Sequence, residues 1–308
     1  MARFLLRRLA HSLAILLGIT FITYALLYLL PADPVQQIAG RNATPDMLAG
    51  IRHQLGLDQP FWLQYLHYVG RLLHGDLGHS YVERTDVSLL LMARLWPSVQ
   101  LMIWGIVCEI AIGISVGVLS ALRRGSSLDR ALMMFSFVGV SAPQFIAAMI
   151  VLYLFAIRLG WFPIGGYGGA SHLVLPALTL GVLGSGWYAR MMRSSMIEVL
   201  HQDFVRTARA KGLTRWRVVF RHVLPNAVLP VIPMIGMDIG YFMSGLVVVE
   251  SVFGWPGVGQ LTWQAIQQVD TPIIVGMTTL SAVAILLGNL VADLVVPYVD
   301  PRINLSHH

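Results

Sequence analysis

Charged residues are scarce in this chain. Only 12% of its 308 residues are Asp, Glu, Lys or Arg, whereas 56% are hydrophobic, and the mean hydropathy is +0.69. Water-soluble domains carry about a quarter charged residues. A chain with half that share needs lipid to cover its apolar surface, which excludes an ordinary soluble domain. The net charge of +6 does not indicate nucleic-acid binding, because the basic residues stand at the ends of apolar segments.

The residues that several kinds of chemistry require are also missing. Cys108 is the only cysteine, which excludes an intrachain disulfide framework and a cysteine metal site. The only lysine, Lys211, is followed by Gly212, so the chain has no P-loop for a nucleotide. No histidines have H-x-x-x-H spacing, and Gly184-Ser185-Gly186 does not match the G-x-S-x-G nucleophile elbow, because Leu183 holds the place of the first glycine. The sequence therefore predicts no catalytic residue, metal or cofactor on this chain.

Long apolar segments are what the chain does have. A bilayer core of ~30 Å needs roughly 20 apolar residues in a helix. Six segments meet or nearly meet this length: Leu9–Leu30, Ser98–Ala121, Leu132–Ile157, Leu173–Ala189, Ala227–Val249 and Ile273–Pro297. The fourth contains Pro176, which leaves open two half-helices or one helix that extends through Tyr188 and Met192. The first is too long for a signal peptide and lacks a cleavage site, so we expect it to be retained.

The arginines predict the orientation of these spans. They cluster before the first span, between the second and third, and in the segment 190–226 between the fourth and fifth, whereas the short alternate loops carry few. The long loop 31–97 has five arginines and six acids, but long loops count little toward orientation. By the positive-inside rule, both termini and segment 190–226 face the cytoplasm. The predicted organisation is an N-terminal transmembrane helix (1–31), an extracytoplasmic helical loop (32–96), a transmembrane core (97–300) and a tail (301–308).

The extracytoplasmic loop has helix signals of its own. Thr44-Pro45-Asp46 is a helix start and Gly56 a stop, and a second helix is predicted from Phe61, where apolar residues recur at helical spacing. Two interpretations stay open: a cap packed on the membrane surface, or a docking platform for an extracytoplasmic partner.

Three acidic residues lie inside predicted spans: Glu109, Asp238 and Asp293. A charge at such depth is costly and usually faces a bundle interior or a water-filled path. For Asp293 we favour a structural contact. For Glu109 and Asp238 both pore lining and helix–helix hydrogen bonding remain possible.

Segment 190–226 is the most informative part of the sequence. A helix is expected over Asp203–Lys211, Gly212 interrupts it, and Thr214 can cap a second short helix. The second helix carries one apolar stripe, and Leu224-Pro225 is expected to end it; the stripe consists of Trp216, Val219, Phe220 and Val223. The result is a compact knob projecting from the membrane. The alternative is an amphipathic helix pair lying on anionic lipid.

This segment resembles the EAA loop of permease subunits of bacterial ABC importers, which reads Glu-Ala-Ala, three residues, Gly, nine residues, Ile-x-Leu-Pro. Ala208, Gly212, Leu224 and Pro225 keep that pattern, whereas Arg206, Thr207 and His222 depart from it. Further segments are similar to the dipeptide/oligopeptide/nickel branch, and the long first outer loop to the first of that branch's two permease types; they are Val205–Gly212, Phe253–Gly259, Asp293 and Asp300-Pro301-Arg302.

The resemblance implies an all-α, type I ABC importer permease fold in the bacterial inner membrane, working by alternating access. It implies a second homologous permease, two cytoplasmic ATPases that carry ATP and Mg, an extracytoplasmic solute-binding protein, and di- or oligopeptides as substrate. It also implies that the loop couples the ATPases to the spans through Ala208, Gly212, Thr214, Trp216, Phe220, Leu224 and Pro225. Alternatives are a nickel or small-solute importer, an ion-coupled secondary carrier or an intramembrane enzyme. A secondary carrier typically has an internal repeat, which we do not find.

Overall fold

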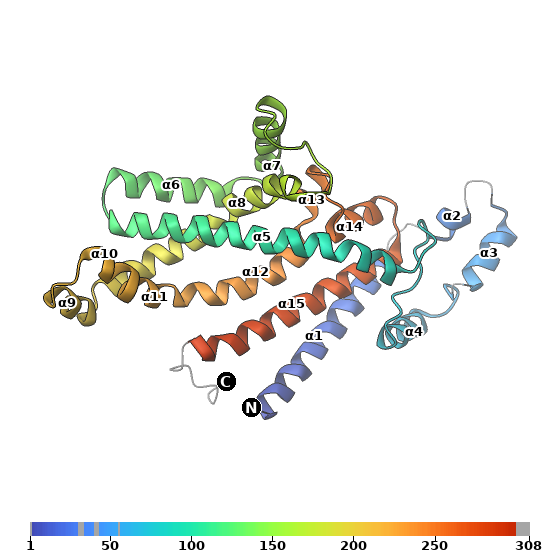
Figure 1. Ribbon diagram of the computed structural model, residues 1–308. Helices are drawn as coiled ribbons and strands as arrows, with labels where there is room; N and C mark the ends of the chain where they lie inside the picture. The colour runs from blue at the N-terminus through green and yellow to red at the C-terminus, as the bar shows by residue number, and fades with distance from the viewer. Residues whose placement is uncertain (1, 30–33, 40–42, 55, 300–308) are drawn as a thin grey trace. The chain divides into compact units, whose positions relative to one another are not determined.

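The computed structural model describes residues 2–29, 34–39, 43–54 and 56–299, and among these it contains helices and one isolated bridge but no strand. The predicted all-α class is therefore confirmed (Figure 1). The chain forms two compact units, residues 1–98 with 256–286 and residues 99–255 with 287–308, and two long helices, α5 (Val87–Leu122) and α15 (Thr271–Val299), contribute to both.

The first unit holds α1, α2, α3, α4, α14 and the outer parts of α5 and α15. The shorter elements are α1 (Ala2–Leu29), α2 (Pro34–Ala39), α3 (Pro45–Gln54), α4 (Phe61–Leu73) and α14 (Val258–Gln267). Its core joins α5 to α14 and α15, through Val87, Leu91, Val258, Leu261, Ala265, Ile273 and Met277. The fully buried Asp270 ties the outer loop to this core, because its carboxylate accepts hydrogen bonds from the Ser80 hydroxyl and from the backbone N–H groups of Tyr81 and Val82.

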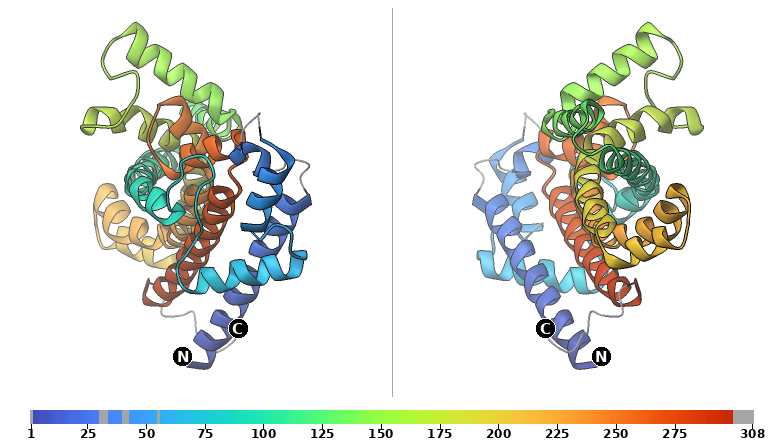
Figure 2. Two further views of the ribbon diagram at one scale, coloured as in Figure 1. Left: turned by 90° about the vertical axis from the view of Figure 1, so that its right-hand side faces the viewer. Right: turned by 90° about the vertical axis from the view of Figure 1, so that its left-hand side faces the viewer.

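Both helices predicted for the outer loop are present, as α3 and α4 (Figure 2). The Thr44 carbonyl accepts the N–H of Leu48 at 3.0 Å and so starts α3. Gly56 follows its end with φ +67°, a conformation that glycine adopts without strain.

The second unit is built on α8 (Ala170–Leu200), which contacts more of its neighbours than any other helix here. The remaining elements are α6 (Ser127–Ser141), α7 (Gln144–Leu152), η1 (Tyr153–Arg158), α9 (Asp203–Ala210), α10 (Arg215–Val218), η2 (Val219–Val223), α11 (Leu224–Ala227), η3 (Leu229–Val231), α12 (Ile232–Gly245) and α13 (Val247–Val252). Small residues let α8 approach α5 closely. A Cβ on Gly181 would lie 2.3 Å from the Cys108 Cβ, and one on Gly113 would lie 2.4 Å from the Tyr188 Cβ. Only glycine fits at such contacts.

The segment predicted as the third span, 132–157, is not one straight helix. It consists of α6 and then α7 with η1, bent by 107° at the break. Pro143 supplies the reason, because proline cannot donate a backbone hydrogen bond and disfavours helical geometry in the residue before it. Ala142 accordingly has φ −70° and ψ 132°, which is extended.

The fourth predicted span is a single helix. α8 runs without a break from Ala170 to Leu200 and so extends through Tyr188 and Met192, which excludes the two half-helices. Pro176 is tolerated because it stands within the first two turns, where few backbone hydrogen bonds can be lost.

Four helical stretches are long and apolar enough to cross a membrane: Val87–Leu122, Ala170–Leu200, Arg215–Phe242 and Thr271–Gly288. The bent pair of α6 with α7 and η1 would be a fifth. In α1 the described apolar stretch is Ala10–Leu26. The predicted number of six spans therefore stays a prediction.

Candidate coupling loop and intramembrane carboxyl cluster

The turn between α9 and α10 is a helix C-cap built around glycine. Gly212 has φ +80°, its N–H donates to the Arg209 carbonyl at 2.9 Å, and the Leu213 N–H reaches the Ala208 carbonyl at 3.4 Å. This pair of hydrogen bonds is the Schellman arrangement, which needs a left-handed residue. The turn between the two short helices is therefore fixed by the backbone of Gly212, as the sequence predicted.

The apolar residues of the second helix face two directions rather than forming the single stripe that we predicted. Val219 and Val223 are buried at 1% and 0% exposure, in a cluster with Ala208 of α9. Trp216 and Phe220 are 62% and 58% exposed, and their rings stack with centroids 5.8 Å apart. The valines hold the knob together, and the stacked aromatic pair projects from it.

Two expectations for this loop differ in detail from the structure. Thr214 occupies the N-cap position of α10, but its side chain makes no capping hydrogen bond to a described residue. Pro225 does not end the helix. It stands at the start of α11, directly after the π-helical turn η2, and the helical path continues from α10 through η2 and α11 into α12. Leu224 is half-buried and packs on the valine cluster, and Pro225 is exposed.

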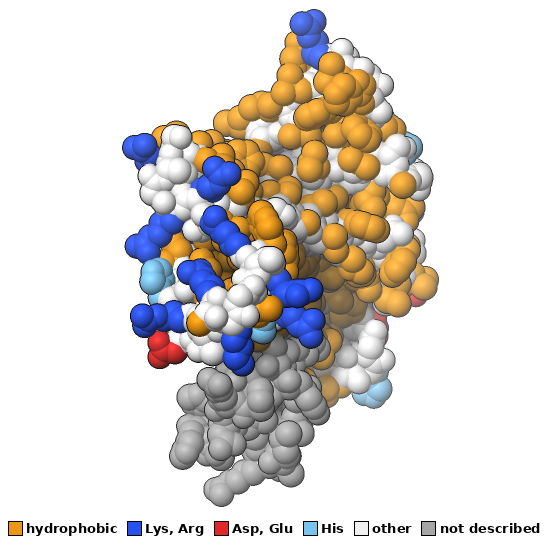
Figure 3. Space-filling view, turned by 60° about the vertical axis from the view of Figure 1, so that its left-hand side comes forward, with side chains coloured by type: hydrophobic (Ala, Val, Ile, Leu, Met, Phe, Trp, Pro, Cys, Tyr) orange, Lys and Arg blue, Asp and Glu red, His pale blue; other side chains and the backbone are white. Residues whose placement is uncertain are grey.

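Basic side chains surround the aromatic pair. Figure 3 shows lysine and arginine gathered at this end of the molecule, with few acids among them; those on the loop are Arg206, Arg209, Lys211, Arg215, Arg217 and Arg221. Arg215 also fixes the loop to the spans, because its Nη2 donates to the Leu122 carbonyl at the end of α5 at 3.1 Å. A movement of the loop would therefore reach α5 directly.

A buried ion pair that the sequence analysis missed braces the helices just before the loop. Asp129, 4% exposed, accepts two hydrogen bonds from Arg193 of α8, both at 2.8 Å, and a third from the Ser120 hydroxyl of α5. Such bidentate pairs are among the stronger polar contacts in proteins. Ser126, three residues before Asp129, is the only signal, since it marks a helix start there and its side chain accepts the Asp129 N–H.

The two candidate pore carboxyls meet in the second unit. Glu109 of α5 is 5% exposed and lies close to Asp238 on α12, which is half-buried. The Tyr188 hydroxyl of α8 donates to Asp238.

The cluster of Glu109, Tyr188 and Asp238 therefore brings side chains of three helices together, with a hydrogen bond between α8 and α12. Glu109 also lies against Gly184 of α8, where a Cβ would be 1.6 Å from its Oε1. The third acid, Asp293, has a side chain outside the described residues. Among the residues that the structure describes, no group of three or more His, Cys, Asp or Glu side chains could hold a metal ion.

Comparison with known proteins identifies the family. Residues 113–305 match the family described as the binding-protein-dependent transport system inner membrane component, and residues 1–102 match the N-terminal family of the same membrane component. The chain belongs to this family. It is thus a permease subunit of an ABC importer and a multi-pass inner-membrane protein, rather than an ATPase.

Relatives of this permease cover almost its whole length. It is 40% identical over 314 residues to the oligopeptide transport system permease protein AppB of Bacillus subtilis, which spans 98% of this chain and 99% of the relative. It is 37% identical over 335 residues to the dipeptide transport system permease protein DppB of Escherichia coli K12, with the same coverage. It is 37% identical over 303 residues to the glutathione transport system permease protein GsiC of Salmonella choleraesuis.

Among solved structures, the permease resembles a chain of the inward-facing MetNI methionine ABC transporter. The TM-score is 0.59 at 20% identity, and the match covers 68% of this chain and 96% of that chain. At this identity the likeness shows the fold alone. It confirms the type I importer permease fold that the sequence predicted.

Proposed function

We propose that this permease moves di- and oligopeptides across the inner membrane, and that the Trp216–Phe220 pair passes ATP-driven closure of partner ATPases to the spans. The observation that supports this role is the exposed stacked pair on a rigid, basic knob. Exposed aromatic side chains each bury 150–250 Å² when covered, and they dominate the energetics of interfaces. We infer that a groove on a partner protein covers the two aromatic rings, because the valines of the knob are already buried inside it and leave the rings exposed.

Charges and contacts of the loop support the same role. Its arginines suit an acidic rim around such a groove, since complementary charge speeds association and fixes register. The contact of Arg215 with the end of α5 provides a path from the loop to a span. The chain has no P-loop of its own, so the proposed ATP and Mg sites belong to the partner subunits.

The remaining partners and the orientation follow the same proposal. Both termini and the loop are cytoplasmic, on the evidence of the arginines. A second homologous permease completes the pathway, two ATPases bind the cytoplasmic face, and a solute-binding protein delivers substrate outside. The peptide substrate is supported by the names of the relatives from Bacillus subtilis and Escherichia coli.

The test is a reconstituted complex carrying Trp216→Ala and Phe220→Ala together. We expect ATP hydrolysis stimulated by the loaded binding protein, and uptake of labelled peptide, to fall at least about tenfold, since interface aromatics contribute ~2 kcal/mol or more. The matched control is Trp161→Ala, which removes a tryptophan that is 65% exposed outside the loop and should leave both rates unchanged.

Two results would contradict the proposal. Full coupling in the double variant would show that the loop is not the mechanical link, and binding of the loop to anionic vesicles would then favour the lipid-surface alternative. Uptake of nickel ions but not of dipeptides or oligopeptides by the wild-type complex would overturn the substrate.

A further inference from the structure

Helix α4 presents three different faces at helical spacing. The aromatic face consists of Phe61, Tyr65 and Tyr68. The apolar stripe consists of Trp62, Leu66, Val69 and Leu73. The polar stripe consists of Gln64, His67, Arg71 and, just past the helix end, His74. A helix that packs on one neighbour needs only one buried face. What the apolar stripe and the polar stripe contact therefore has to be explained.

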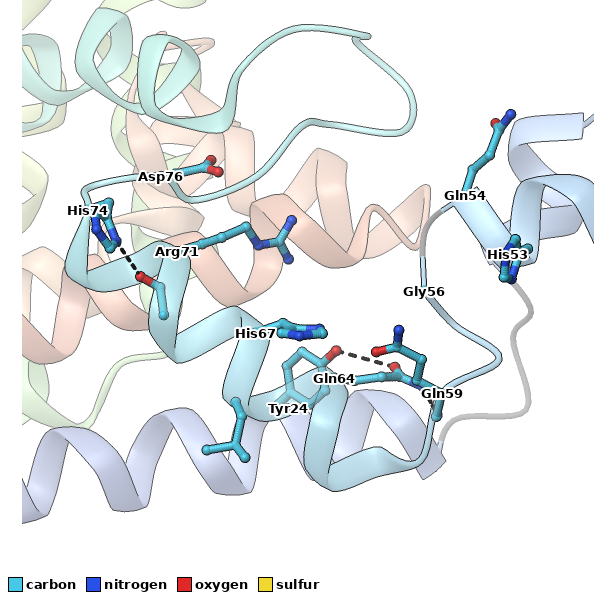
Figure 4. Close-up of a pocket in the computed structure, with 12 residues that line it drawn as sticks. Tyr24, His53, Gln54, Gly56, Gln59, Gln64, His67, Arg71, His74 and Asp76 are labelled. Carbon is cyan, nitrogen blue, oxygen red and sulfur yellow. Dashed lines mark hydrogen bonds between the residues drawn. The ribbon is translucent and has the colours of Figure 1, made fainter.

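The aromatic face packs between α1 and α15 within the first unit. The Tyr65 hydroxyl lies 3.1 Å from both the Leu17 carbonyl and the Thr20 hydroxyl of α1. The Tyr68 hydroxyl lies 2.7 Å from the Thr279 hydroxyl of α15. Figures 2 and 4 show α4 lying along α1, consistent with these contacts. These contacts fix the position of α4 along the lengths of α1 and α15.

The contact points lie well inside both long helices rather than beyond their ends. Thr279 is about two turns, or ~12 Å, beyond the start of α15 at Thr271, where the stretch able to cross a membrane begins. Leu17 is more than three turns, or ~18 Å, before the end of α1 at Leu29. One leaflet of a bilayer core is ~15 Å deep. The contacts thus place α4 beside the spans at the depth of the hydrocarbon.

The apolar stripe is uncovered at this depth. Trp62 and Leu73 are 67% and 80% exposed, and Leu66, which is 62% exposed, also borders the pocket described below. On α1, the apolar side chains of Ile22 and Leu26 are 59% and 61% exposed, as expected of a helix that faces lipid. The stripe is as uncovered as this predicted span, and acyl chains are the cover that fits it.

The polar stripe faces a pocket of about 640 Å³ instead. Figure 4 shows His67 and Arg71 directed into it, with Gly56 and Gln59 on its opposite wall. Gln64 closes one end, because its amide donates to the Gln59 carbonyl at 2.7 Å. Asp58 hydrogen-bonds the pocket residue His53 and raises the pKa of its imidazole, which favours a charged, hydrated side chain. The pocket suits water and not lipid.

We propose that α4 is embedded in the membrane leaflet in which α15 begins, with its apolar stripe on acyl chains and its polar stripe lining a water-filled pocket. This arrangement matches amphipathic helices that lie within the bilayer interface, where Trp and Leu point to the chains and basic residues to water. In the orientation proposed above, this is the outer leaflet. The inference does not depend on the substrate or on the coupling loop.

The test uses the complete complex in proteoliposomes, with Cys108 replaced by alanine and one nitroxide label at a time. Leu73→Cys and His74→Cys put labels on the apolar and polar stripes at neighbouring positions, and of the two only His74 lines the pocket. We expect the label at 73 to be severalfold more accessible to oxygen than to a nickel chelate, and the label at 74 to show the reverse. Leu26→Cys on α1 serves as the lipid reference and Arg124→Cys, in an exposed turn, as the water reference.

Two outcomes would overturn the proposal. Equal access of the nickel chelate to both labels would place α4 above the bilayer. A label at 73 that neither reagent reaches would show that protein, such as the second permease, covers the stripe. If Leu73→Cys fails to assemble, Trp62→Cys on the same stripe takes its place. Since none of these readouts measures transport, they can fail without affecting the proposed function.

Discussion

Two regions of the second unit depend on glycine for opposite reasons. Where α5 meets α8, Gly113 and Gly181 are needed because a Cβ would collide with the facing helix. In the coupling loop, a Cβ on Gly212 would meet no described heavy atom within 4 Å, but φ is +80°. The first region requires residues without a side chain. The second requires a positive φ, which residues other than glycine adopt only with strain.

The comparison separates folding from function. The α5–α8 contact is buried and connects to the cluster of Glu109, Tyr188 and Asp238, so a change there acts on the packing of the whole unit. The loop presents Trp216 and Phe220 outward, so a change there acts on what the permease can bind. The following predictions test this separation.

The largest effect is expected for Gly181→Val. Its Cβ would overlap Cys108, whose own backbone lies 3.2 Å away, so α5 and α8 must separate, and overpacking of this kind destabilises by ~1–3 kcal/mol or more. We expect loss of the assembled complex in size-exclusion chromatography. Gly18→Val is the matched control, because no described atom lies within 4 Å of a Cβ on Gly18 of α1. Equal loss in both variants would mean that helix propensity, and not close approach, is responsible.

The contact of Gly184 with Glu109 predicts non-additive effects. Gly184→Ala alone puts a Cβ 1.6 Å from the Glu109 carboxyl, so the buried Glu109 side chain must shift and the thermal stability of the complex should fall. Glu109→Ala alone removes a buried side chain and leaves a cavity between α5 and α8, which should also lower the stability. In the double variant the clash is gone, so the combined loss should be smaller than the sum of the single losses. Additive losses would show that the two residues are not in contact.

In the loop, Gly212→Val should abolish transport while leaving membrane insertion and complex yield unchanged. A β-branched residue at positive φ costs ~1–3 kcal/mol, which is enough to change the direction of α10 and the position of its Trp216. Uptake and stimulated ATP hydrolysis should fall together. Gly212→Asn is the control, since asparagine tolerates the left-handed conformation and should keep most of the activity. If the valine variant transports like wild type, the turn does not set the aim of the loop.

The smallest effect is expected for Thr214→Ala. Because the Thr214 side chain makes no capping hydrogen bond to a described residue, its loss should change the thermal stability and coupling little. Ser126→Ala is the contrast, since Ser126 accepts the Asp129 N–H at 3.2 Å and caps of this kind contribute ~0.5–2 kcal/mol. A marked loss of coupling in Thr214→Ala would show that the cap, together with Gly212, shapes the loop.

Several features of this protein could be predicted from local patterns, whereas the orientation drawn from the arginines and the coupling role of the loop stay predictions. Apolar length indicated segments that form long apolar helices, and Thr44-Pro45 with Gly56 marked the ends of α3. The spacing of Ala208, Gly212, Leu224 and Pro225 indicated the family. These features follow from the backbone and from residues close in sequence, so no tertiary contact is needed to infer them.

Other features depend on which helix faces meet, and only the tertiary structure decided them. The predicted apolar stripe of the loop faces two directions, because Val219 and Val223 pack in a cluster with Ala208. Trp216 and Phe220 therefore remain exposed. The bidentate pair of Asp129 and Arg193 joins residues 64 positions apart, and Glu109 and Asp238, which lie close together, are still farther apart in the sequence. Helical periodicity predicts that a residue lies on a face but not which partner that face meets, because packing fixes the partner through the rotation and spacing of whole helices.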